Sequence, residues 1–163
     1  AGMKSFFKHL RENLPGIRIS ADLFGLSTVN PDDLGIGQVI EDAYKNFDYV
    51  SPMIYPSHYA AGFNGYANPA QYPYEVVKYS LEKALVRLEA LASSTSTPGV
   101  LAKLRPWLQD FDLGATYTAA MVRKQIAATE DVLATSSASA WYAGWLLWDP
   151  SNTYTEGALA PGT

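Results

Sequence analysis

Short apolar runs and longer amphipathic stretches alternate along this chain, and that alternation constrains the fold more than any other feature of the sequence. Runs rich in β-branched and aromatic residues predict strands, and apolar residues three and four positions apart predict helices. The expected strands are 17–24, 49–55, 104–109 and 141–148, and the expected helices are 4–14, 37–47, 74–91 and 118–133, the last capped by Thr118. Strands that alternate with helices predict an α/β fold with a parallel sheet, right-handed crossovers and a layer of helices.

An open doubly wound sheet and a β/α barrel both fit this order of elements. No glycine-rich phosphate loop follows any expected strand, which argues against the nucleotide-binding form of the open sheet. Four strands do not close a barrel, which requires eight. Pro106 lies inside the third expected strand and argues against a regular strand there.

Length and composition exclude several classes of protein. The chain has 163 residues, the length of roughly one domain. Lys and Arg number 12 against 16 Asp and Glu, whereas binding nucleic acid as the main partner needs clustered basic residues in excess. No apolar run reaches the ~18 residues of a membrane helix, so we expect no membrane span. The absence of cysteine excludes disulfides and thiolate metal sites, and it leaves the compartment open.

Two segments between the expected elements differ in composition from the rest. Residues 56–73 are rich in Tyr, Asn, Gly and Pro, and long loops in compact domains are more often functional. Residues 93–99 consist of Ser, Thr, Pro and Gly, which predicts a flexible surface linker without chemistry of its own.

The ligand site of a parallel α/β protein lies beyond the carboxyl ends of its strands. We expect it to involve Asp22 after the first strand, Tyr55, Ser57 and His58 after the second, Gln109 and Asp110 after the third, and Trp148 and Asp149 after the fourth. By alternation along the strands, Asp22, Tyr55, Gln109 and Trp148 are expected to converge on one mouth.

Asp22 is the catalytic candidate, because it is a carboxylate at a strand end on an interior face. The structural alternative is that Asp22 caps the following loop or pairs with Arg18 or Arg105. His58 is one of only 2 histidines and is either a hydrogen-bonding site residue or an ordinary loop residue. A histidine metal site and a Gly-x-Ser-x-Gly nucleophile elbow both lack support.

Aromatic residues make up 13% of the chain, and sugars offer apolar C–H faces that stack on flat rings. The aromatics at or near the expected mouth are Tyr55, Tyr59, Phe63, Tyr66, Trp107, Trp148 and Tyr154. The alternative is core and loop packing, which we favour for Trp107 and Trp141.

Six strings along the chain resemble those of the putative glycosyl hydrolase domain family, a group of bacterial proteins expected to be glycosidase-like β/α barrels. The strings are SADLFG (20–25), GIGQ (35–38), SPMIYPSHY (51–59), PYEVV (73–77), RPWLQDF (105–111) and GWLLWD (144–149). The resemblance implies that residues 1–163 are one partial domain, the C-terminal half of a TIM-type (β/α)8 barrel with about strands five to eight. The family's Asp-Tyr-Val-Arg-Phe-Pro string, expected to supply a carboxylate from the fourth strand, is absent.

The resemblance also implies a function: a glycoside hydrolase fragment that acts on a polysaccharide or cell-wall glycan and is inactive, or nearly so, without the other half. Asp22 would act as general acid/base, and Tyr55, His58, Gln109, Asp110 and Trp148 would bind sugar. Glycoside hydrolysis uses two carboxyl groups, so the partner of Asp22 is expected on the missing half, with Asp110 and Asp149 as the local alternatives. No metal or organic cofactor is implied, and the compartment would be extracellular or the cell envelope.

Two other interpretations stay open. The first is a carbohydrate-binding or scaffold domain that has the barrel fold without turnover, since fold alone does not establish activity. The second is that two copies pair, because a half barrel leaves edge strands and an apolar interior exposed.

Overall fold

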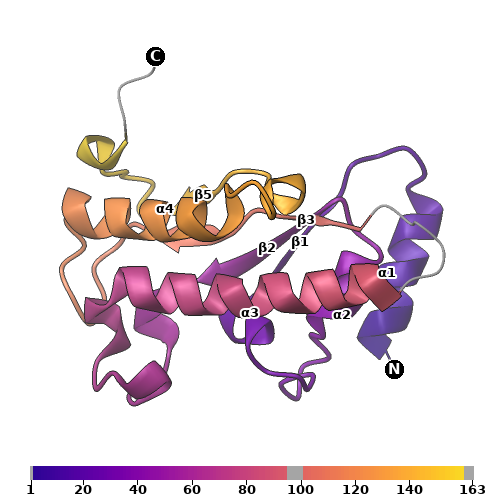
Figure 1. Ribbon diagram of the computed structural model, residues 1–163, viewed down its shortest axis with the longest axis horizontal. Coiled ribbons are helices and arrows are strands. Elements are labelled where there is room, and N and C mark those ends of the chain that lie inside the picture. The colour runs from indigo at the N-terminus through magenta and orange to yellow at the C-terminus, as the bar shows by residue number, and fades with distance from the viewer. Residues whose placement is uncertain (1, 95–100, 160–163) are drawn as a thin grey trace.

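The computed structural model describes residues 2–94 and 101–159, and it shows an α/β fold built on one parallel sheet (Figure 1). The strands are β1 (Ser20–Phe24), β2 (Tyr49–Ile54), β3 (Lys103–Leu104), β4 (Trp107–Gln109) and β5 (Leu146–Trp148). The order across the sheet is β1-β2-β4-β5, and β3 pairs with β2 just before β4. All pairings are parallel, so the prediction of an α/β fold with a parallel sheet is confirmed.

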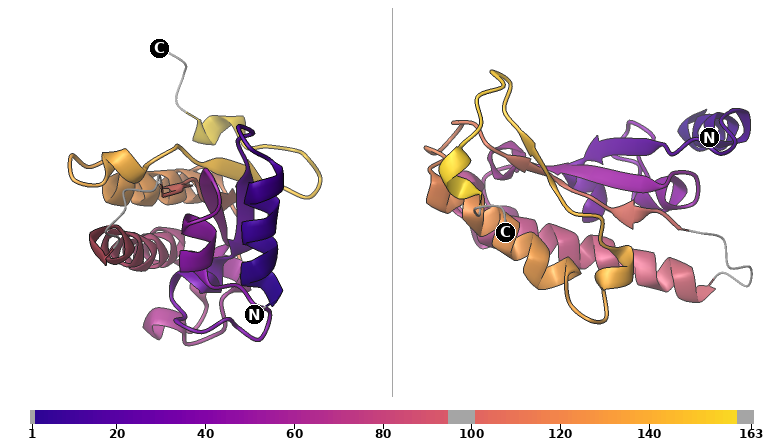
Figure 2. Two further views of the ribbon diagram at one scale, coloured as in Figure 1. Left: turned by 90° about the vertical axis from the view of Figure 1, so that its right-hand side faces the viewer. Right: turned by 90° about the horizontal axis from the view of Figure 1, so that it is seen from above.

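The helices gather on one side of this sheet. They are α1 (Gly2–Asn13), α2 (Ile40–Tyr44), α3 (Pro73–Ser94) and α4 (Ala119–Leu133). The two long helices, α3 and α4, run side by side along the same face, as Figure 2 shows from above. The short α2 lies between α3 and α1, and α1 packs against the segment after α2 through the rings of Phe7 and Phe47, 5.0 Å apart. Within the described ranges no helix covers the opposite face of the sheet.

The core lies between the sheet and the helices, because every second strand residue points toward them. In β1 the residues alternate between exposed and buried from Ser20 to Phe24. The buried strand residues are Ala21, Leu23, Val50, Ile54, Leu104 and Leu108, and they meet Val77, Leu81, Ala84 and Leu88 of α3. In β1 the alternation therefore gives one face for packing and one exposed face, whereas β2 and β4 also bury Ser51 and Gln109.

Several predicted strands are shorter than their patterns. The strand expected over 17–24 begins at Ser20, and the strand expected over 49–55 ends at Ile54. The strand expected over 104–109 is divided into β3 and β4, because Pro106 has no N–H to donate to the sheet. Of the segment 141–148 only Leu146–Trp148 is a strand, and Trp141 belongs to a 3-10 turn.

The helices also differ from their patterns at their ends. Of the helix expected over 37–47, only α2 is helical. The helix does not begin at Gly37, because the backbone of this residue is in the left-handed region with a φ of +78°. Helix α3 runs on through Ser94, so the first two residues of the predicted linker are helical, and residues 95–99 lie outside the described residues. The predicted cap is confirmed, since Thr118 accepts a hydrogen bond from the Met121 N–H of α4.

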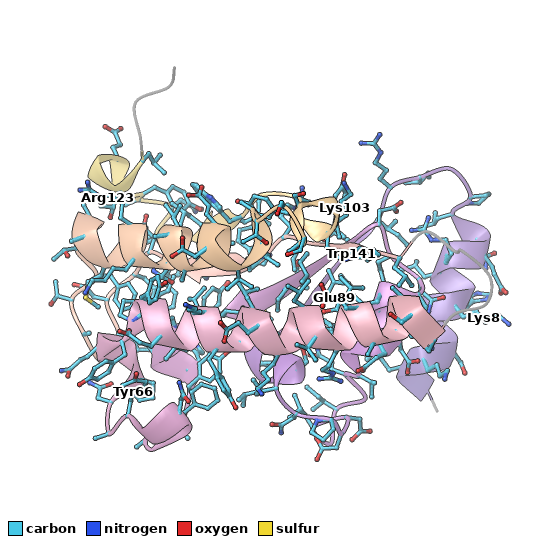
Figure 3. The ribbon with its side chains drawn as sticks, in the orientation of Figure 1. Lys8, Tyr66, Glu89, Lys103, Arg123 and Trp141 are labelled. Atoms are coloured by element: carbon cyan, nitrogen blue, oxygen red, sulfur yellow. The ribbon has the colours of Figure 1, made fainter. Side chains whose placement is uncertain are left out.

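The long loop after β2 lies at the carboxyl end of the sheet. It contains three 3-10 turns, η2 (Pro56–His58), η3 (Phe63–Gly65) and η4 (Pro69–Gln71). Tyr66 marks this loop in Figure 3, at the opposite end of the molecule from Lys8 on α1. No helix within the described ranges is long and apolar enough to span a membrane.

Candidate functional site

The face of the sheet without helices carries polar and aromatic side chains in rows. Strand register sets the rows, because partners in parallel strands point to the same side. The rows are Ser20, Tyr49 and Lys103; Asp22 and Ser51; Phe24, Met53, Trp107 and Leu146; and Gln109 with Trp148. This face, which we call the open face, therefore brings Asp22 and Trp148 to the same surface.

Asp22 lies in the middle of β1 rather than after it, because the strand continues to Phe24, and its carboxylate is exposed on the open face and held by an indole. Its Oδ1 accepts a hydrogen bond from Trp107 Nε1 at 3.0 Å. The Trp107 ring stands nearly perpendicular to the Trp148 ring, with centroids 6.1 Å apart. In the described part of the chain no ion pair joins Asp22 to Arg18 or Arg105. Trp107, which we expected to pack in the core, instead orients the candidate carboxylate.

Polar groups continue toward the amino end of the open face. The hydroxyl oxygens of Ser20 and Ser51 are 3.1 Å apart. The guanidinium of Arg105 lies over the Tyr49 ring, 4.5 Å from its centroid, a cation–π contact. This face is thus unlike the apolar layer on the other side of the same strands.

Tyr55 follows β2 and is buried, with 8% of its surface exposed. Burial raises the pKa of its hydroxyl, and the negative charge of Asp22 raises it further. Tyr55 therefore stays protonated at neutral pH and can donate a hydrogen bond.

His58 is oriented by a chain of hydrogen bonds that begins at Gln109. Gln109 is fully buried, and its Nε2 donates to the Phe111 carbonyl at 2.8 Å. Its Oε1 accepts from the Ser57 hydroxyl at 2.9 Å and from the Ser57 N–H at 3.2 Å. The Ser57 Oγ lies 3.0 Å from His58 Nδ1. Gln109, predicted to bind substrate, thus lies behind Ser57 and positions it.

Ring contacts fix the His58 end of this hydrogen-bond chain, and helix α4 fixes the Gln109 end. The rings of Tyr55, His58 and Phe111 meet edge to face, with centroids 5.4 to 5.9 Å apart. From α4, Gln125 Nε2 donates to the Gln109 carbonyl, and Gln125 Oε1 accepts from the Gln109 N–H. The orientation of His58 therefore depends on the fold.

The two aspartates after β4 and β5 are both buried. Asp110 Oδ2 accepts from the Thr155 N–H at 2.8 Å, and its Oδ1 has no partner within the described residues. Asp149 accepts hydrogen bonds from the Ser151 hydroxyl and N–H, and the hydroxyl lowers the pKa of its carboxyl most. Asp149 shapes the turn after β5, and Asp110 ties the end of β4 to the segment that contains Tyr154.

The remaining predicted aromatics lie in the loop after β2. Tyr59 is buried and packs against Phe63 at 4.4 Å. Tyr66 stacks on Tyr72 with centroids 4.0 Å apart and an interplanar angle of 20°. These rings pack within the loop, whereas Trp107 contacts Asp22 and Trp148 packs against Trp107.

A cavity of about 290 Å³ lies beside these residues, and the sequence patterns did not reveal it. It is lined by Phe24, Gly25, Leu26, Met53, Tyr55, His58 and Tyr59. Its sequence signal is Gly25, directly after β1. A Cβ there would lie 2.6 Å from both the Met53 carbonyl oxygen and the Tyr59 hydroxyl, so only glycine fits without displacement.

Comparison with known proteins supplies one match. A family described as "Putative glycosyl hydrolase domain" matches residues 1–154. Neither the curated proteins nor the solved structures contain a match to the chain. Within the described ranges no group of three or more His, Cys, Asp or Glu side chains is arranged to hold a metal ion.

Proposed function

This chain belongs to the putative glycosyl hydrolase domain family, and on that premise we propose that it forms one side of the active site of a glycoside hydrolase that acts on a polysaccharide or cell-wall glycan. One observation supports the proposal most: the exposed carboxylate of Asp22, in the middle of β1, accepts a hydrogen bond from Trp107, whose ring packs against that of Trp148. Carboxylates beside aromatic faces are the groups that glycoside hydrolysis and sugar stacking require.

The proposed roles follow from where each side chain lies. Asp22 acts as general acid/base. Trp148, with 41% of its surface exposed, stacks on a sugar ring. Tyr55 and His58 hydrogen-bond sugar hydroxyls, and Gln109 acts through Ser57. Asp110 is buried and its Oδ2 accepts from the Thr155 N–H, so it shapes the margin of the site instead of touching the sugar.

We further propose that the sheet is the C-terminal half of a (β/α)8 barrel, with about strands five to eight. Two observations support this proposal. Sheet neighbours follow chain order, and the helices cover one face only, as in a barrel whose other face is the interior. The second carboxylate would then come from the other half, because Asp110 and Asp149 already accept hydrogen bonds in turns. The isolated chain would be inactive or nearly so.

The test compares this chain with a version extended by the N-terminal half of the barrel. Both are assayed on chromogenic glycosides and cell-wall polysaccharides. Activity is expected in the extended protein, and Asp22→Asn should lower it about a thousandfold. Asp32→Asn, in an exposed loop, serves as the matched control. Near-normal turnover in Asp22→Asn would remove Asp22 from the mechanism.

A carbohydrate-binding domain without turnover is the second candidate. It is favoured by the aromatic open face, on which Asp22 is held by an indole rather than paired with a second carboxylate. Glycan binding without hydrolysis in the extended protein would select this function.

Self-association through the open face is the third proposal. Phe24 and Trp148 are 54% and 41% exposed there, and β1 and β5 are edge strands. Sedimentation of the isolated chain at several concentrations would distinguish a dimer from a monomer.

A further inference from the structure

The cavity beside Asp22 has apolar walls and a polar margin. Phe24, Leu26 and Met53 supply apolar surface, and Tyr55 and His58 supply polar groups. Small-molecule pockets range from about 300 to 1,000 Å³. At about 290 Å³ this cavity has the size for a single ring.

Hydrogen bonds behind the walls hold the cavity open before any ligand binds. The Tyr59 hydroxyl lies 3.0 Å from the Ser80 hydroxyl of α3, and Thr28 donates to the Gly25 carbonyl at 2.7 Å. Arg87 donates to the carbonyl oxygens of Ser27 and Asn30, which closes the turn that contains Leu26. Binding to a preformed pocket has a smaller entropic cost, because the walls of the pocket are already ordered.

The hydrogen-bond chain also determines which nitrogen of His58 is free. The Ser57 hydroxyl hydrogen is used on Gln109, so the Ser57 oxygen accepts from Nδ1–H of His58. Nε2 of the neutral ring then carries a lone pair, and no described residue donates to it. This polarity is the reverse of a serine nucleophile, whose hydroxyl donates to the imidazole. His58 therefore offers a hydrogen-bond acceptor.

We propose that this cavity is a sugar subsite that binds one pyranose ring, with a C–H face against Phe24 and Met53 and a ring hydroxyl that donates to His58 Nε2. The proposal deepens the proposed function and rests on it. A pyranose matches the cavity because it combines an apolar face with hydroxyl donors at its rim. Phe24 lies two residues beyond Asp22 on the same face of β1, which places this sugar next to the candidate carboxylate.

The chain contains 3 methionines, which makes a direct test possible. Met53 lines the cavity, whereas Met3 lies in α1 and Met121 in α4. We would label the methionine methyl groups with ¹³C in the 163-residue chain and assign Met53 with Met53→Leu. The probes are the methyl glycosides of glucose, galactose, mannose, N-acetylglucosamine and rhamnose, with cyclohexanol as an apolar ring that has a single hydroxyl.

The expected result is that at least one glycoside shifts the Met53 signal and leaves the Met3 and Met121 signals in place. Phe24→Ala should weaken that binding about tenfold. Phe6→Ala is the matched control, because Phe6 of α1 is also 54% exposed and should leave binding unchanged. The Met3 and Met121 signals report whether each variant is folded.

Two variants of His58 test the acceptor. A glutamine amide reaches the position of Nε2, whereas an asparagine amide reaches only that of Nδ1. His58→Gln should therefore bind nearly as well as the parent chain, and His58→Asn about fivefold more weakly. Equal losses in both variants would overturn the assignment of Nε2.

Other outcomes are equally decisive. A Met53 signal that responds to no glycoside, or only to cyclohexanol, overturns the sugar subsite. A shift that survives unchanged in Phe24→Ala overturns the placement of the sugar on Phe24. Since the readout is binding, it is separable from hydrolysis. A Met53 shift without turnover in the extended protein would support the sugar subsite and overturn the proposed hydrolase activity. Turnover without a Met53 shift would support the hydrolase activity and overturn the sugar subsite.

Discussion

The two faces of the sheet are built from the same strands, yet they differ in almost every property. The covered face is apolar and buried, with Val50, Ile54 and Leu108 packed under the helices. The open face carries a carboxylate held by an indole, a guanidinium over a tyrosine ring, and a buried hydroxyl. Neighbouring residues of a strand point to opposite faces, so residues that stabilise the fold alternate with residues of the candidate site. Substitutions on the covered face should therefore change the free energy of unfolding, and substitutions on the open face should change activity or binding.

Leu108→Ala on the covered face tests the stability side of this comparison. Leu108 has no exposed surface, and removing its side chain leaves a cavity between β4 and the helices. We expect a loss of about 3 kcal/mol in the free energy of unfolding, measured by urea denaturation. A loss of less than about 1 kcal/mol would mean that the sheet and helices are not closely packed.

Arg87→Met tests how the helix layer is tied to the loop that forms the cavity. Arg87 makes a two-pronged ion pair with Glu41, with N–O distances of 2.5 and 2.6 Å, and also donates to loop carbonyls. Removal of the guanidinium leaves a partly buried carboxylate and these carbonyls unpaired. We expect a loss of about 2 kcal/mol by urea denaturation. Lys4→Met, which removes a longer ion pair between an exposed lysine and Asp42 (3.4 Å), should cost less than about 1 kcal/mol.

The same ion pair predicts a pH dependence of stability. Burial raises the pKa of Glu41, but the hydrogen bond and the charge of Arg87 outweigh it, so its pKa in the folded protein is lowered. A lowered pKa means that the contribution is complete above the ordinary value of 4.5 and is lost as the pH falls through the folded value. Urea denaturation between pH 6 and 3 should show a shallower decline in Arg87→Met than in the parent chain. Parallel declines would contradict this assignment.

Trp107→Phe on the open face has the smallest expected effect on stability. It keeps a ring beside Trp148 and removes only the Nε1–H bond to Asp22. We expect a change of less than about 1 kcal/mol in the free energy of unfolding. In the extended protein kcat should nevertheless fall about tenfold, because the carboxylate is no longer oriented. A large loss of stability with unchanged kcat would show that Trp107 is a packing residue. The open face would then contribute to stability as the covered face does.

The order of the elements followed from the periodicity of the chain, and the errors have local causes. Pro106 interrupts a strand because it lacks an N–H, and Gly37 delays a helix because its backbone is left-handed. Thr118 was recognised as a cap because its hydroxyl serves the backbone a few residues away. Such local signals are visible in the sequence. The exact end of a strand, in contrast, depends on how far the adjacent strand in the sheet continues to provide hydrogen-bonding partners.

The site was predictable in part. Alternation identified Asp22 and Trp148 as residues of one face, because the side-chain period of a strand is two. The burial of Gln109 and the part played by Trp107 were not predictable, since both depend on partners 16 to 85 residues away, namely Gln125, Ser57 and Asp22. The cavity was missed for the same reason: its lining comes from the ends of two strands and from the turns that follow them.

The sequence by itself determined the alternation of strands and helices, the polarity of each strand face and the membership of the family, because these depend on residue type and spacing. Only the tertiary structure decided which side chains meet. Trp107 orients Asp22, Gln109 orients His58 through Ser57, and Gly25 lets the turn after β1 approach β2. These contacts join residues distant in the chain, and their geometry exists only after the strands have taken their register and the helices have packed.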